Sequence, residues 1–73
     1  MLSQFTAVFE QDGNWWIGFV EEIPGANTQG ATLDEARENL KEAVTLILET
    51  NRELAELDIA GRNVIKESFV VTL

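Results

Sequence analysis

Two segments near the start of the chain, in each of which apolar and polar residues alternate, flank an Asp-Gly pair. Residues 3–11 and 15–21 are rich in Phe, Val, Ile and Trp, which favour strands. Asp12-Gly13 is a strong hairpin signal, because a type I′ turn needs positive φ at both central residues. The pattern predicts a two-stranded hairpin in which Phe9 lies opposite Trp16.

The expected register separates the hairpin into two faces of different character. A one-residue slip would exchange the faces, so the alternation constrains the pairing. One face is uncharged and carries Phe5, Ala7, Phe9, Trp16, Gly18 and Val20. The other face mixes polar and acidic residues with four large apolar ones, which are Val8, Trp15, Ile17 and Phe19.

A long amphipathic helix is expected in the second half of the chain. Pro24-Gly25 ends the second strand, and residues 26–29 are a candidate third strand. Thr32-Leu33-Asp34-Glu35 fits a capping box, in which Thr32 caps the helix and Glu35 reaches back to the cap. Apolar residues then recur at helical spacing, which predicts a helix to about Glu56.

The remaining residues complete an α+β fold of order β-β-β-α-β. Residues 58–63 are expected to form a loop, and residues 68–73 a last strand. The first three strands would form an antiparallel meander. The fourth would lie parallel to the first, joined by a right-handed crossover, with the helix packed on one face of the sheet. We expect a single domain over residues 1–73.

One helix covers only one face of such a sheet, so the second face needs another partner. We expect the helix to cover the face with Phe5, Ala7, Phe9, Trp16 and Val20. An uncovered apolar patch usually marks an interface, so we predict a protein interface at Val8, Trp15, Ile17 and Phe19. Two alternatives stay open: Trp15 lies over the hairpin beside Glu10, or residues 58–67 cover the patch.

Composition narrows the chemistry further. The chain has no Cys and no His, which removes disulfides, thiolate metal sites and the usual general base. Its net charge is −8, which disfavours direct binding to nucleic acid or anionic membranes and favours a basic partner. Met1-Leu2-Ser3-Gln4 does not begin a signal peptide, and no apolar run reaches about 20 residues. We expect a cytoplasmic protein.

Enzymatic activity is not expected, and neither is a cofactor or a bound metal. Glu10, Asp12 and Glu21 are the only carboxylates on or beside the first two strands. Glu10 and Glu21 share a face but lie at opposite ends of the hairpin. At about 3.3 Å per residue they are too far apart for the ~4 Å spacing of a two-metal nuclease centre.

The order of motifs resembles the HicB family of antitoxins. The resemblance runs through Phe5–Glu10 and Trp16–Ala36, and it includes Pro24-Gly25, Thr28-Gln29-Gly30 and the capped helix. It implies a truncated RNase H-like fold. It also implies a partner, a HicA-type toxin, which is a small basic ribonuclease that cleaves messenger RNA and is neutralised by direct contact.

Two departures from the HicB pattern bear on these expectations. Ala26 stands where many members have a Cys. We also expect residues 1–73 to include no separate DNA-binding domain, and therefore no direct operator binding. We expect a homodimer or higher oligomer, formed through the middle of the apolar patch. Two alternatives to the antitoxin are an orphan homo-oligomeric regulatory or structural domain and a divergent metal-dependent nuclease.

Overall fold

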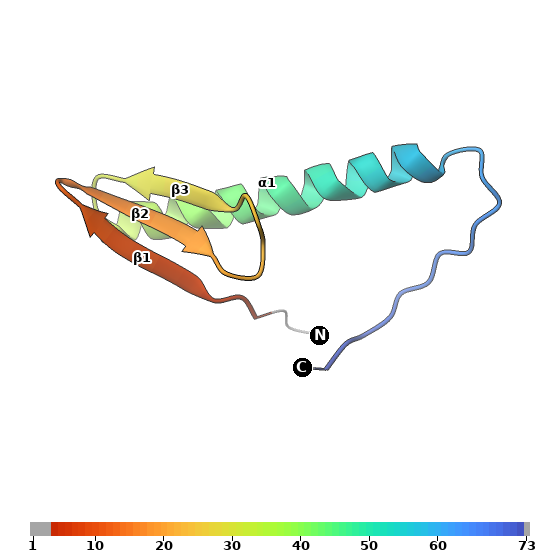
Figure 1. Ribbon diagram of the computed structural model, residues 1–73, viewed down its shortest axis with the longest axis horizontal. Helices are drawn as coiled ribbons and strands as arrows, with labels where there is room; N and C mark the ends of the chain where they lie inside the picture. Colours follow the sequence, from red (N-terminus) through yellow and green to blue (C-terminus); the bar gives the residue numbers. More distant parts are fainter. Residues whose placement is uncertain (1–3, 73) are drawn as a thin grey trace.

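The computed structural model describes residues 4–72 and has an α+β architecture (Figure 1). A three-stranded antiparallel sheet of order β1-β2-β3 packs against one face of a long helix. The elements are β1 (Ala7–Asp12), β2 (Trp15–Val20), β3 (Asn27–Gly30) and α1 (Leu33–Ile59). The predicted meander and helix are therefore confirmed.

The hairpin register differs from the predicted one by two residues. Phe9 lies opposite Gly18, not Trp16, and the pair Asp12 and Trp15 closes a two-residue loop. The loop begins at Gly13, whose φ is +61°, while no described residue other than glycine has positive φ. Positive φ at the first loop position alone is the pattern of a type II′ turn, which is why the loop starts one residue later than expected. Because the shift is two residues, every side chain keeps its predicted face.

The core forms where α1 packs on β3 and β2. Phe9, Val44 and Ile47 pack against it from the side. The buried apolar residues are Val20, Ile23, Ala26, Ala36 and Leu40. The prediction that the helix covers the whole uncharged face is only partly correct, because α1 lies away from β1 and leaves Ala7 exposed and Phe5 44% exposed.

The N-terminal end of α1 packs closely against β3. A Cβ on Gly30 would lie 2.6 Å from the backbone nitrogen of Ala36, so only glycine permits this approach. The Thr32 hydroxyl accepts a hydrogen bond from the Glu35 N–H at 3.1 Å, which confirms the predicted cap. The Glu35 carboxylate reaches back to the N–H of Ala31, one residue before the cap, at 3.3 Å.

The link between β2 and β3 contributes to the core as well as to the turn. The Val20 N–H donates to the Ala26 carbonyl at 3.0 Å, and the Ala26 N–H donates to the Ile23 carbonyl at 3.1 Å. These bonds fold the link back, so that Ile23 and Ala26 are both buried. Gly25 between them adopts a φ of +86°, which few other residues tolerate.

The predicted fourth strand is not formed in the described residues, and Leu73 lies outside them. Helix α1 continues to Ile59 instead of ending near Glu56, and residues 63–72 have no regular structure. An ion pair between Lys66 and Glu56 holds the start of this tail beside the far end of α1. The tail in Figure 1 runs beside no strand. Sequence pattern alone did not show that α1 would project past the sheet.

The chain is more extended than a compact domain of its length. Its radius of gyration is 15.7 Å, and its longest dimension is 52 Å. A compact domain of this length has a radius of gyration of about 11 Å. The excess comes from the projecting half of α1 and from the tail, which bury little surface in the chain itself.

We predict that Gly30→Ala lowers the free energy of unfolding by about 3 kcal/mol, because the new methyl group would push α1 off β3. Thermal unfolding followed by circular dichroism measures the effect. The matched control is Gly61→Ala, where φ is +77° but no atom lies within 4 Å of the new methyl group. Gly61→Ala should lower the free energy of unfolding by only about 1 kcal/mol, because alanine is strained at this positive φ. Equal costs at the two positions would contradict the close approach.

Candidate protein interface

The four residues predicted as an interface lie together on the side of the sheet opposite α1. We call this surface the outer face; its members are Val8 on β1 and Trp15, Ile17 and Phe19 on β2. Trp15, Ile17 and Phe19 are 50%, 37% and 41% exposed, and Val8 is half-buried. Residues 58–67 do not cover this face, so large apolar side chains stay open to solvent.

Strand pairing arranges the outer face as an apolar stripe with polar flanks. On the β1 side, Phe19 lies opposite Val8, Ile17 opposite Glu10, and Trp15 opposite Asp12. On the β3 side, Ile17 lies opposite Gln29 and Phe19 opposite Asn27. An aromatic centre with a polar rim is the usual composition of a protein–protein interface.

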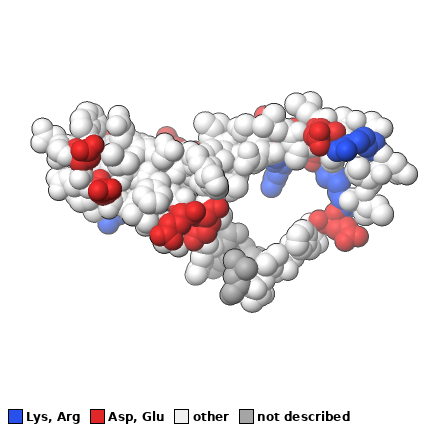
Figure 2. Space-filling view, in the orientation of Figure 1, with Lys and Arg blue, Asp and Glu red and all other residues white. Residues whose placement is uncertain are grey.

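The charge around the outer face has one sign. Residues 1–36 contain six Asp or Glu and no Lys or Arg. The first two cations, Arg37 and Lys41, are paired with Asp34 at 2.7 Å and Glu38 at 3.2 Å. Figure 2 shows most of the Lys and Arg near the far end of α1 and the tail. The segment that forms the sheet therefore carries a net negative charge.

A side-chain clamp holds the segment before β1 against the link after β2. The Glu22 carboxylate accepts hydrogen bonds from the Thr6 N–H and the Thr6 hydroxyl, each at 2.7 Å. Both bonds lower the pKa of Glu22, and the bond from the backbone N–H has the larger effect. The Glu21 N–H also donates to the Thr6 carbonyl at 3.0 Å, so the pairing of the hairpin extends beyond β1.

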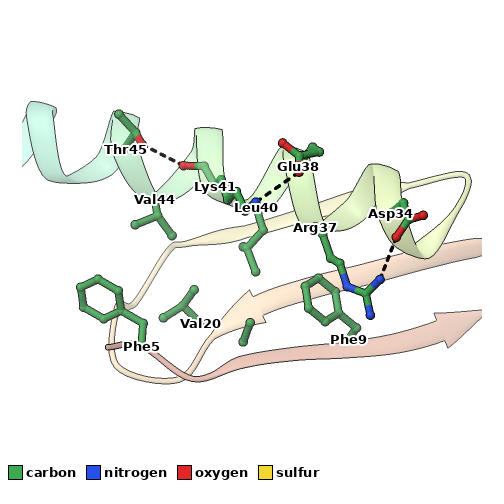
Figure 3. Close-up of a pocket in the computed structure, with 11 residues that line it drawn as sticks. Phe5, Phe9, Val20, Asp34, Arg37, Glu38, Leu40, Lys41, Val44 and Thr45 are labelled. Carbon is green, nitrogen blue, oxygen red and sulfur yellow. Dashed lines mark hydrogen bonds and ion pairs between the residues drawn. The ribbon is translucent and has the colours of Figure 1, made fainter. Parts of the chain in front are cut away.

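A groove runs between β1 and α1 on the other side of the sheet (Figure 3). Its volume is about 630 Å³. We call it the β1–α1 groove. Its apolar lining is formed by Phe5, Ala7, Phe9, Val20, Leu40 and Val44, and the charged residues along α1 are Asp34, Arg37, Glu38 and Lys41. The sequence did not predict this groove, because it depends on where α1 lies across the strands.

The carboxylates of the described residues do not gather into a metal-binding cluster. Within residues 4–72, no three Asp or Glu side chains are placed to share a metal ion. Glu10 pairs across the hairpin with Ile17, whereas Glu21 bonds to Thr6 at the opposite end. The same stretch contains no helix of the length and apolar character that crossing a bilayer requires.

We predict that Glu22 titrates below its unfolded-state pKa. A lowered folded-state pKa means that ionised Glu22 stabilises the fold at neutral pH. This contribution is lost as the pH falls through the folded-state pKa. NMR titration of the carboxyl carbon measures the midpoint, with urea-unfolded protein as the reference. Thr6→Val removes the hydroxyl donor but keeps the N–H, so it should raise the midpoint only part of the way. Identical midpoints in folded and unfolded protein would contradict the clamp.

Comparison with known proteins places the chain among small proteins of one family. No family model matches it, and neither does any solved structure. A UPF0150 protein of Synechocystis sp. is 46% identical over 55 residues, which cover 73% of this chain and 75% of the relative. A UPF0150 protein of Archaeoglobus fulgidus is 33% identical over 64 residues, which cover 86% of this chain and 93% of the relative. A UPF0150 protein of Thermotoga maritima is 45% identical over 47 residues, which cover 62% of this chain and 63% of the relative.

The names of these relatives state no activity and do not mention HicB, so the predicted HicB resemblance is not confirmed by them. The aligned segments nevertheless cover 73% and 86% of this chain and 75% and 93% of the relatives from Synechocystis sp. and Archaeoglobus fulgidus. On this evidence, the chain belongs to the UPF0150 family.

Proposed function

We propose that this protein is an antitoxin-like binding module that neutralises a small basic HicA-type toxin ribonuclease by direct contact. The observation that carries the proposal is the outer face, an exposed apolar stripe on a sheet without a positive charge. The toxin class comes from the HicB resemblance. Such a toxin acts on messenger RNA, so the proposal places the protein in the cytoplasm.

The outer face offers the two features that such binding requires. Trp15 and Phe19 supply exposed aromatic area, and aromatic residues often contribute most to binding energy. Glu10 and Asp12 lie beside the stripe, where carboxylates would speed encounter with a cationic surface. A ribonuclease needs cationic side chains to bind the phosphates of RNA. A negatively charged protein bound to those side chains would therefore exclude the RNA substrate.

Self-association through the centre of the outer face is the second part of the proposal. Only five apolar residues are buried in the described chain, which is a thin core. Small domains of this kind commonly gain stability by oligomerising. In a two-fold dimer each copy uses the same patch, and Ile17 lies at the middle of the stripe. The face also extends to Trp15 and Phe19, which would leave apolar area for a toxin at its ends.

An orphan homo-oligomeric domain is the alternative that the thin core favours. It would use the same surface but would have no toxin partner. The two proposals differ only in whether a basic ribonuclease binds, so a direct binding assay separates them.

For the antitoxin role, the protein is mixed with the product of the neighbouring gene, and RNA cleavage is measured. We expect a stable complex and loss of cleavage. Phe19→Arg should weaken inhibition about 30-fold, corresponding to about 2 kcal/mol for a central aromatic residue. The matched control is Leu46→Arg, an exposed apolar position on α1, which should inhibit like the unchanged protein. No complex and undiminished cleavage would overturn the antitoxin role and leave the orphan domain.

For self-association, static light scattering gives the mass in solution. We expect at least a dimer for the unchanged chain. Ile17→Arg should raise the concentration for half-dissociation at least about tenfold, because it places charge in the apolar stripe. Leu57→Arg, exposed near the end of α1, is the control and should leave that concentration unchanged. If Ile17→Arg and the control behave alike, the dimer does not form through the outer face.

A further inference from the structure

We infer that residues 68–72 of a second copy of this chain add as a strand to the free edge of β1 and cover the β1–α1 groove. This contact uses a different surface from the outer face and does not depend on a toxin. Three features carry the inference: an unpaired strand edge, an apolar groove beside it, and an exposed apolar segment with a strand-like pattern.

The free edge of β1 follows from the hydrogen bonds of the hairpin. The Thr6 carbonyl accepts from the Glu21 N–H, so the backbone groups of Thr6 point toward β2. These groups alternate along a strand, and those of Val8 and Glu10 therefore also face β2. The N–H and C=O groups of Ala7, Phe9 and Gln11 point away from β2, on a side where residues 4–72 place no strand.

The two edges of the sheet are not equivalent. At β3, the Asn39 side chain of α1 donates to the Gln29 carbonyl at 3.0 Å, and α1 packs along the strand. Among the residues that the structure describes, none covers the edge of β1 in this way. Its six residues include no Lys and no Pro, and its pairing with β2 is continuous without a bulge. Lys, Pro and bulges usually protect an edge, and the only charges on β1 are those of Glu10 and Asp12 toward the turn, so the edge from Ala7 to Phe9 is open to another strand.

The β1–α1 groove gives the added strand an apolar seat. Phe9 lies over Gly18, where a Cβ would come within 2.9 Å of its ring. Phe5 is 44% exposed, and Leu40 and Val44 line the opposite wall from α1 (Figure 3). A strand beside β1 would direct every second side chain toward this groove.

The segment Ser68–Thr72 matches both the edge and the groove. Phe69, Val70 and Val71 are 80%, 70% and 51% exposed, which is unusual for three consecutive large apolar residues. In an extended segment Phe69 and Val71 share one side, and Val70 lies on the other. Phe69 and Val71 would enter the groove, and Val70 would extend the outer face beside Val8. β-Branched and aromatic residues of this kind favour strands.

The course of the tail indicates a second copy instead of the same chain. In the described chain residues 63–72 have no regular structure and run beside no strand of their own sheet (Figure 1). The Lys66–Glu56 ion pair lies about 18 Å along α1 beyond Val44, at the end of α1 away from the groove. The tail therefore leaves the β1 edge of its own chain free, and a two-fold pair would exchange two tails.

Cross-linking tests this directly, because the chain has no Cys of its own. Full-length Glu10→Cys protein, carrying a tag that changes its size, is mixed with untagged Val70→Cys protein and a short bismaleimide. We expect a cross-linked heterodimer as the main product. The control pair replaces Glu10→Cys with Asn27→Cys, on the strand whose edge Asn39 occupies, and should give at least tenfold less. Equal yields from the two pairs would overturn the proposal.

Four further variants keep the result decisive. Phe69→Lys combined with Val71→Lys should abolish the cross-link, and Ile65→Lys should not; all three positions are exposed, so the fold is kept. A dilute Glu10→Cys, Val70→Cys double variant should give covalent dimers. If it closes only within single chains, the tail belongs to its own β1, and the second-copy proposal is wrong. Phe19→Arg protein should still cross-link, so failure of the outer-face proposal is distinguishable from failure of this one.

Discussion

The rest of the structure depends on the close contact between Gly30 and the first turns of α1. With no Cβ at Gly30, the backbone of Ala36 approaches β3 directly, and the Thr32 cap fixes where the helix begins. This contact seats α1 over β3 and β2, so that Leu40 meets Val20, Ile23 and Ala26 in the core. The same placement leaves β1 without a helix above it. One packing constraint therefore creates both the core and the surfaces that remain open.

Two surfaces stay uncovered in the described chain, and they differ in character. The outer face is an aromatic stripe between polar flanks, which suits a protein partner. The free edge of β1 and its groove offer backbone hydrogen bonds and apolar depth together, which suits an extended segment. Only five apolar residues are buried among residues 4–72, so on our proposals the chain gains stability when other molecules cover these surfaces. Binding and stability would then be two consequences of the same thin core.

The alternating pattern predicted the faces of the hairpin correctly but not its register. Side chains alternate with a period of two, so a shift of two residues left Val8, Trp15, Ile17 and Phe19 on one face. The turn could not be placed, because Asp12-Gly13 and Gly13-Asn14 both supply a glycine. The pattern also could not show that α1 avoids β1 or that the tail stays off the sheet. Those outcomes depend on tertiary contacts such as Gly30 with Ala36.

Small-angle X-ray scattering of the full chain tests the central claim, that the molecule is completed by other molecules. The account predicts a forward scattering at least twice that of a single 8.2 kDa chain, even without a toxin. A single chain with a radius of gyration of about 11 Å, the value for a compact domain of this length, would contradict it. In that case the chain would close its own open edge and groove.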